Sequence, residues 1–93
     1  MVDDQELTGD ERELLKGWLD RVGPEALVFE LASACSVKVA MCKHSDEEID
    51  GEKMIAGGPW YYSAKQWRWM AMRLHRMGSK LYRMKAYEPG ADL

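Results

Sequence analysis

Apolar residues recur at helical spacing in the first quarter of the chain. Five large apolar side chains follow an acidic start: Leu14, Leu15, Trp18, Leu19 and Val22. Residues three or four positions apart share one face of a helix, so this stripe predicts an amphipathic helix. Thr8 and Glu11 have the spacing of a capping box and place the helix start near Thr8. Gly23 is expected to end this helix, and Pro24 suits the first turn of the next one.

A second helix is predicted from about residue 24 to residue 42. Its apolar face comprises Leu27, Leu31, Ala34, Cys35 and Val39. Further apolar residues widen this face, so we expect this helix to be the most buried of the chain. The segment SVKVAMC also suits a strand because valine favours sheets. We prefer a helix because the segment continues the spacing of Leu27 and Leu31 without a turn signal.

The third helix has the clearest pattern. Ser63 and Gln66 form a second capping box, and the helix is expected to reach about Lys85 or Tyr87, before Pro89. Its core-facing stripe comprises Trp67, Met70, Ala71, Leu74, Met77, Leu81 and Met84. Gly78 interrupts the helix with a small residue, which would permit a close crossing with another helix.

Residues 43–59 separate the second and third predicted helices. This segment is rich in acids and contains two adjacent glycines and a proline, which indicates a loop. We therefore predict an all-α fold, a small three-helix bundle with a long acidic and glycine-rich loop between helices 2 and 3. Residues 1–93 would form a single helical domain, with residues 1–7 and 88–93 frayed.

Composition adds a charge asymmetry to this picture. The chain has 93 residues, of which 46% are hydrophobic and 31% charged, a balance typical of soluble globular proteins. Residues 1–52 contain 14 acids and five bases, whereas residues 53–87 contain eight bases and no acid. The polar N-terminus is unlike a secretory signal, and no apolar run is long enough for a membrane span. We expect a cytoplasmic protein that does not bind membranes.

The residues capable of metal or nucleophilic chemistry do not form a known motif. Cys35 and Cys42 lie two turns apart on one predicted helix, about 10 Å along its axis, so we expect reduced thiols. The spacing of Cys35, Cys42 and His44 does not match a zinc motif. Nothing in the sequence places His75 beside a nucleophile. We therefore expect no metal, no cofactor and no enzymatic activity.

Exposed aromatic and acidic residues make a protein partner the first hypothesis. Tryptophan and tyrosine are enriched in binding hot spots. The candidate partner-binding residues are Trp60, Tyr61, Tyr62, Trp69, Asp46, Glu47, Glu48 and Asp50.

The third helix supports an alternative, a nucleic-acid-binding module. Basic groups neutralise phosphates, and aromatic side chains stack on bases. The candidate residues are Lys65, Arg68, Arg73, Arg76, Lys80 and Arg83. The same bases could instead pair with acids on the neighbouring helices, and we weigh this internal pairing above nucleic-acid binding. A homodimer is possible under either hypothesis, because the acidic half of one copy can meet the basic half of another.

Two segments carry a resemblance to a group of known proteins. ELASACSVKVAMC, followed by the tryptophan-bearing helix AKQWRWMAMRL, resembles small helical proteins of phages and mobile elements. The resemblance covers roughly residues 25–77. It implies a phage-encoded accessory protein without catalytic residues. Inhibitors of host defence, such as anti-CRISPR proteins, are common among such proteins, so the implied partner is a bacterial host protein or complex.

Overall fold

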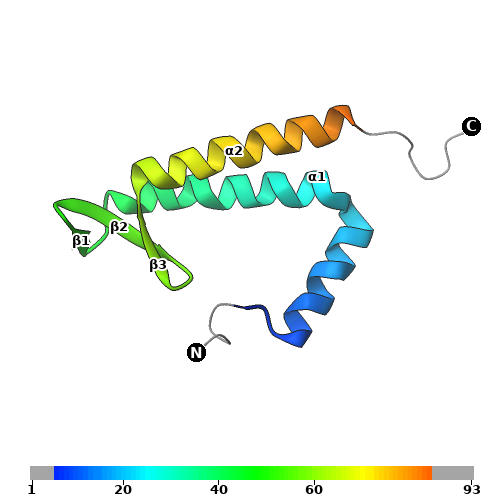
Figure 1. Cartoon of the computed structure of the whole chain (residues 1–93), viewed down its shortest axis with the longest axis horizontal. Coiled ribbons are helices and arrows are strands. Elements are labelled where there is room, and N and C mark those ends of the chain that lie inside the picture. Colours follow the sequence, from blue (N-terminus) through cyan, green and yellow to red (C-terminus); the bar gives the residue numbers. More distant parts are fainter. Residues whose placement is uncertain (1–5, 85–93) are drawn as a thin grey trace, which may run out of the picture.

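The computed structural model describes residues 6–84 and contains two helices and three strands (Figure 1). In chain order these are α1 (Gly9–Cys42), β1 (Glu47–Ile49), β2 (Glu52–Gly57), β3 (Trp60–Ser63) and α2 (Ala64–Arg83). The two long helices pack together, and the strands that connect them form a small antiparallel sheet. The predicted all-α three-helix bundle is therefore wrong, and the fold is α+β.

The helix α1 contains a sharp bend at Gly23. Gly23 has φ 86° and ψ 167°, a backbone conformation that is essentially restricted to glycine. Pro24 follows at the start of the next turn, where its missing N–H is not needed. We call residues 9–22 the arm and residues 24–42 the long segment. Figure 1 shows the long segment beside α2 and the arm turned away from both.

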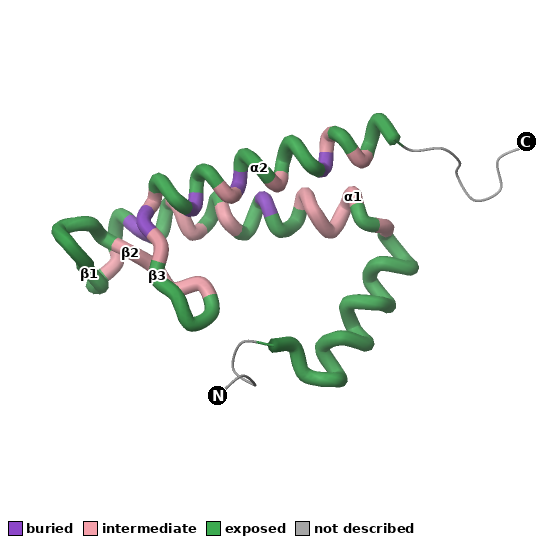
Figure 2. Tube along the Cα trace, in the orientation of Figure 1, coloured by how far each residue is buried: buried purple, intermediate pink, exposed green. Residues whose placement is uncertain are grey.

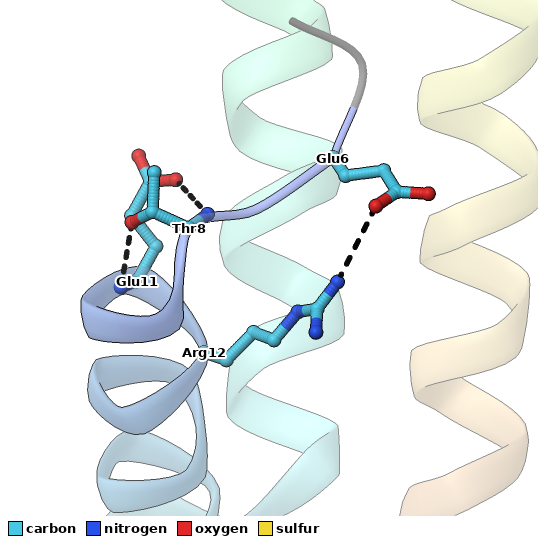
Figure 3. Close-up of polar contacts among 4 residues, drawn as sticks. All are labelled: Glu6, Thr8, Glu11 and Arg12. Atoms are coloured by element: carbon cyan, nitrogen blue, oxygen red, sulfur yellow. Dashed lines mark hydrogen bonds and ion pairs between the residues drawn. The ribbon is translucent and has the colours of Figure 1, made fainter. Parts of the chain in front are cut away.

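Both predicted capping boxes are present. At the start of the arm, the Thr8 hydroxyl accepts from the Glu11 backbone N–H, and the Glu11 carboxylate accepts from the Thr8 N–H at 2.7 Å (Figure 3). Ser63 and Gln66 repeat this arrangement at the start of α2. Each box satisfies two backbone donors that a helix leaves unpaired. The predicted end of α2 at residues 85–87 lies outside the described residues. So does most of the predicted fraying at residues 1–7 and 88–93, of which only residues 6 and 7 are described, outside any helix or strand.

The sheet occupies the segment that was predicted to be a loop. Its strands are ordered β1-β2-β3 and pair antiparallel, with Glu47 opposite Met54 and Ile55 opposite Tyr62. Asp50 and Gly51 connect β1 to β2 with φ values of 53° and 82°. Two consecutive positive φ angles define the type I′ turn, whose twist matches that of a hairpin. Residues 43–59 thus form most of an ordered sheet rather than a loop.

Buried residues lie along the contact between the two helices and where the sheet meets them. Trp67 on α2 is buried, and its indole Nε1 donates to the Ile55 carbonyl on β2 at 3.2 Å. Its ring meets Tyr62 edge to face at 5.1 Å and fills the space beside Gly57, where a β-carbon would lie 2.8 Å from Trp67 Cζ2. From α1, the Lys38 ammonium donates to the Ala56 carbonyl at 3.3 Å. Each helix thus holds β2 through one hydrogen bond to its backbone.

Gly78 permits the close helix crossing that the sequence predicts. Gly78 is buried, and a β-carbon there would lie 2.7 Å from Cε1 of Phe29 on the long segment. The Phe29 ring also lies 5.2 Å from the His75 ring. The ring of Phe29 therefore occupies the space that any larger residue at position 78 would need.

The apolar stripe of the arm is exposed, whereas the predicted bundle required it to pack against the other helices. Every described residue before Gly23 is exposed, including Trp18 (Figure 2). On α2 the predicted stripe is confirmed at Trp67 and Ala71, but Met77 and Met84 are exposed. The chain turns at Gly23, so the arm points away from the long segment and α2 and its apolar stripe does not pack against them. Within residues 6–84, neither helix is long and apolar enough to cross a membrane.

Candidate interaction surfaces

A hollow at the junction of β3 and α2 brings together two of the predicted binding residues. Tyr62 from the end of β3 and Trp69 from the second turn of α2 line it, together with Lys65, Gln66 and Met70. Its volume is about 340 Å³. We call this feature the aromatic hollow. Trp69 is 60% exposed, so a partner could reach a large part of its indole ring.

Arg73 orients the indole ring of Trp69. The Arg73 guanidinium carbon lies 5.2 Å from the centroid of the Trp69 ring. A cation at this distance from an aromatic face contributes about 0.5–1 kcal/mol at an exposed site. The pair therefore presents a flat apolar surface next to a positive charge. Such a combination suits a partner that offers an apolar side chain beside a carboxylate.

The structure places Trp60 and Tyr61 outside the aromatic hollow. Trp60 begins β3 opposite Gly57, at the turn end of the strand, and is 63% exposed. Tyr61 follows it and is also exposed. Both remain candidate contact residues, but they belong to the free end of the sheet rather than to the hollow.

The predicted acidic residues lie on the first hairpin. Asp46 precedes β1, Glu47 and Glu48 belong to it, and Asp50 forms the turn. Their side chains are exposed, and Glu48 faces Lys53 across the ladder. None of these acids lines the aromatic hollow. They form a separate negative surface, which we call the acidic hairpin.

A basic face runs along the exposed side of α2, and at Arg68 it reaches the contact with α1, where Arg68 lines a hollow together with Phe29 and Ser33. Its six bases are exposed, namely Lys65, Arg68, Arg73, Arg76, Lys80 and Arg83. Their spacing places them around exposed Trp69 and Met72 on one side of the helix. The ion pairs within residues 6–84 are Arg12–Glu6 at 3.6 Å (Figure 3) and Lys16–Glu13 at 3.2 Å. The expected internal pairing of these six bases with acids of α1 is therefore not present in the described part of the chain.

The contacts of the cysteines and of His75 are structural. The Cys42 thiol is buried and donates a long hydrogen bond of 3.8 Å to the Tyr62 carbonyl. Burial raises the pKa of the Cys35 thiol above its usual value, which makes it a weaker nucleophile at neutral pH. The His75 ring packs against the Phe29 ring. Across residues 6–84, no three His, Cys, Asp or Glu side chains gather in a metal-binding cluster.

Two residues of the hollow were missed by sequence reasoning. Gln66 and Met70 lie four residues apart on α2, and so do Lys65 and Trp69. Such spacing marks neighbouring positions on a helix surface, so the helix alone could have indicated them. Their contact with Tyr62 depends on the direction in which β3 leads into α2, and this direction could not be inferred while residues 43–59 were predicted to be a loop.

Comparisons of the chain with protein families, with curated proteins and with solved structures found no match.

Proposed function

We propose that this chain is a non-enzymatic binding protein whose protein partner docks in the aromatic hollow. The observation that carries the proposal is the exposure of Trp69 in a hollow that Tyr62 and Met70 also line. Tryptophan, tyrosine and arginine dominate the energetics of protein interfaces. Arg73 lies beside Trp69 and supplies the third of these residue types.

The chemistry of the hollow defines the expected partner. An apolar side chain would enter between Tyr62 and Trp69, and a carboxylate would approach Lys65 or Arg73. A partner segment with an apolar residue beside Asp or Glu meets both requirements. The free end of the sheet and the acidic hairpin would add outer contacts, which contribute less than the desolvated centre of an interface.

The resemblance to small phage proteins indicates which partner to test first. We propose a cytoplasmic bacterial host protein, such as a component of a defence or regulatory system that the chain inhibits. Trp69→Ala should abolish this interaction, because it removes the largest side chain of the hollow. Trp18→Ala is the matched control, since Trp18 is an exposed tryptophan on the arm.

A pull-down from bacterial lysate tests the proposal. One half of the lysate is treated with nuclease, and bound proteins are identified by mass spectrometry. A partner that survives nuclease, is retained by Trp18→Ala and is lost with Trp69→Ala supports the proposal. A partner retained equally by Trp69→Ala would contradict docking in the hollow.

The basic face of α2 supports a second candidate function, binding of nucleic acid. Its six bases form no ion pairs with acids among the described residues, and Trp69 is available among them for base stacking. Affinity for a fluorescent oligonucleotide should then fall steeply with salt. Arg68→Glu with Arg76→Glu should abolish binding, whereas Lys16→Glu on the arm should have a much smaller effect. Absence of binding at low salt would exclude this function.

A further inference from the structure

The arm is a helix whose apolar side chains stay exposed within residues 6–84. It carries Leu14, Leu15, Trp18, Leu19 and Val22, and all five are exposed. An isolated helix of this length is only marginally stable in water. Most helices in proteins depend on packing of their apolar face. The arm therefore requires a surface to pack against that residues 24–84 of the same chain do not offer.

A groove crosses the bend at Gly23. Leu15, Trp18 and Val22 line it from the arm, and Leu27 and Leu31 line it from the long segment. Its volume is about 500 Å³. Leu31 is 55% exposed, so the apolar surface continues beyond the bend and away from α2. We call this feature the bend groove.

The bend groove carries one positive and one negative side chain, so the grooves of two copies can be complementary in charge. Its charged lining residues are Arg21 on the arm and Glu30 on the long segment. Neither forms an ion pair with another residue in the described range. A twofold axis brings the same patch of two copies together, so that residue i meets residue j and residue j meets residue i. A twofold axis that passes between Arg21 and Glu30 would place Arg21 of each copy opposite Glu30 of the other.

We propose that two copies of this chain associate through their bend grooves and form a twofold-symmetric dimer. The arm of each copy packs on the apolar surface of the other copy's bend. The dimer would cover the exposed apolar side chains of the arm and Leu31. This dimer uses a surface that shares no lining residue with the aromatic hollow. The dimer and the proposed function can therefore be tested independently.

The oligomeric state of the full chain tests the proposal first. Light scattering during gel filtration should give twice the 10.7 kDa mass of one chain. Trp18→Ala should weaken the dimer by at least about tenfold in Kd, the factor that corresponds to loss of a modest buried contact. Trp69→Ala should leave the dimer unchanged. A wild-type chain that stays monomeric up to its solubility limit would overturn the proposal, because the arm would then remain unpaired, fold back on its own chain or await another protein.

Charge reversal tests the symmetry of the pairing. Arg21→Glu and Glu30→Arg should each weaken the dimer, because each places like charges opposite one another. An equimolar mixture of the two variants should form heterodimers, in which both contacts are again between opposite charges. Circular dichroism on each variant confirms that its helices are retained. Failure of the mixture to associate more strongly than either variant alone would overturn the twofold arrangement.

Discussion

The ring of Phe29 on α1 occupies the space beside Gly78 on α2, so close that a β-carbon at position 78 would lie 2.7 Å from its edge. This contact sets the distance between the two helices. Gly78→Ala should therefore destabilise the protein by about 1–3 kcal/mol, the usual cost of overpacking a core. Urea unfolding measures this change.

A second substitution distinguishes overpacking from other effects of Gly78→Ala. Phe29→Leu replaces the ring with a smaller side chain and should be destabilising by itself. In the double variant, Phe29→Leu should offset part of the stability lost through Gly78→Ala, since the new methyl group at position 78 then has room. Strictly additive changes in the free energy of unfolding would argue against direct contact between the two positions.

The bend at Gly23 depends on glycine. Its φ of 86° with ψ near 167° is strained for any residue with a β-carbon, at a cost of about 1–3 kcal/mol. Gly23→Ala should thus destabilise the chain or change the direction of the arm. Gly17→Ala is the matched control, because Gly17 is helical and has open space beside it. That control should stabilise the arm by up to about 1 kcal/mol, and equal effects at the two positions would contradict the bend.

Trp67 anchors the sheet to α2 through its indole nitrogen. Trp67→Phe leaves the Ile55 carbonyl without this donor and should lower the free energy of unfolding by about 1–3 kcal/mol. Trp60→Phe changes the same residue type at an exposed position and should shift stability by less than about 0.5 kcal/mol. Urea denaturation of both variants provides the comparison. A Trp67→Phe variant as stable as Trp60→Phe would show that the hydrogen bond contributes little.

The two thiols should react at different rates. Cys42 is only 2% exposed, so a thiol reagent should modify it only when the protein opens. Burial raises the pKa of Cys35, so less thiolate is present at pH 8 than in a free cysteine, and its reaction should be slower than that of a small thiol. The difference in rate between Cys35 and a small thiol should shrink as the pH rises through the raised pKa of Cys35. The variant Cys35→Ser isolates Cys42, and rapid modification of that variant under native conditions would contradict its burial.

The helices were predictable because their signals are local. Thr8 with Glu11 and Ser63 with Gln66 satisfy backbone donors within four residues, and the apolar spacing around Trp67 identifies the packed face of α2. Gly78 also indicated a close crossing. These features depend little on the rest of the fold, so the sequence alone predicts them.

The sheet and the exposed arm depend on longer-range relationships. Asp50-Gly51 is a strong hairpin signal, but the flanking β1 is short and acidic, and β2 ends in Ala56 and Gly57, which are weak strand formers. The stripe around Trp18 shows that the arm needs an apolar partner surface. Helical spacing does not reveal whether that surface belongs to the same chain. Part of the aromatic hollow was also missed, because the hollow forms only when β3 places Tyr62 beside α2, and local spacing does not reveal this contact.

Site-specific photo-crosslinking tests docking in the aromatic hollow most directly. A photoreactive benzoyl-phenylalanine replaces Trp69 in one version of the chain and Trp18 in another, and cells that contain the partner are irradiated. We predict a covalent product with a distinct protein from position 69, and a product between two copies of the chain from position 18. A partner that crosslinks from position 18 but never from position 69 would contradict the account.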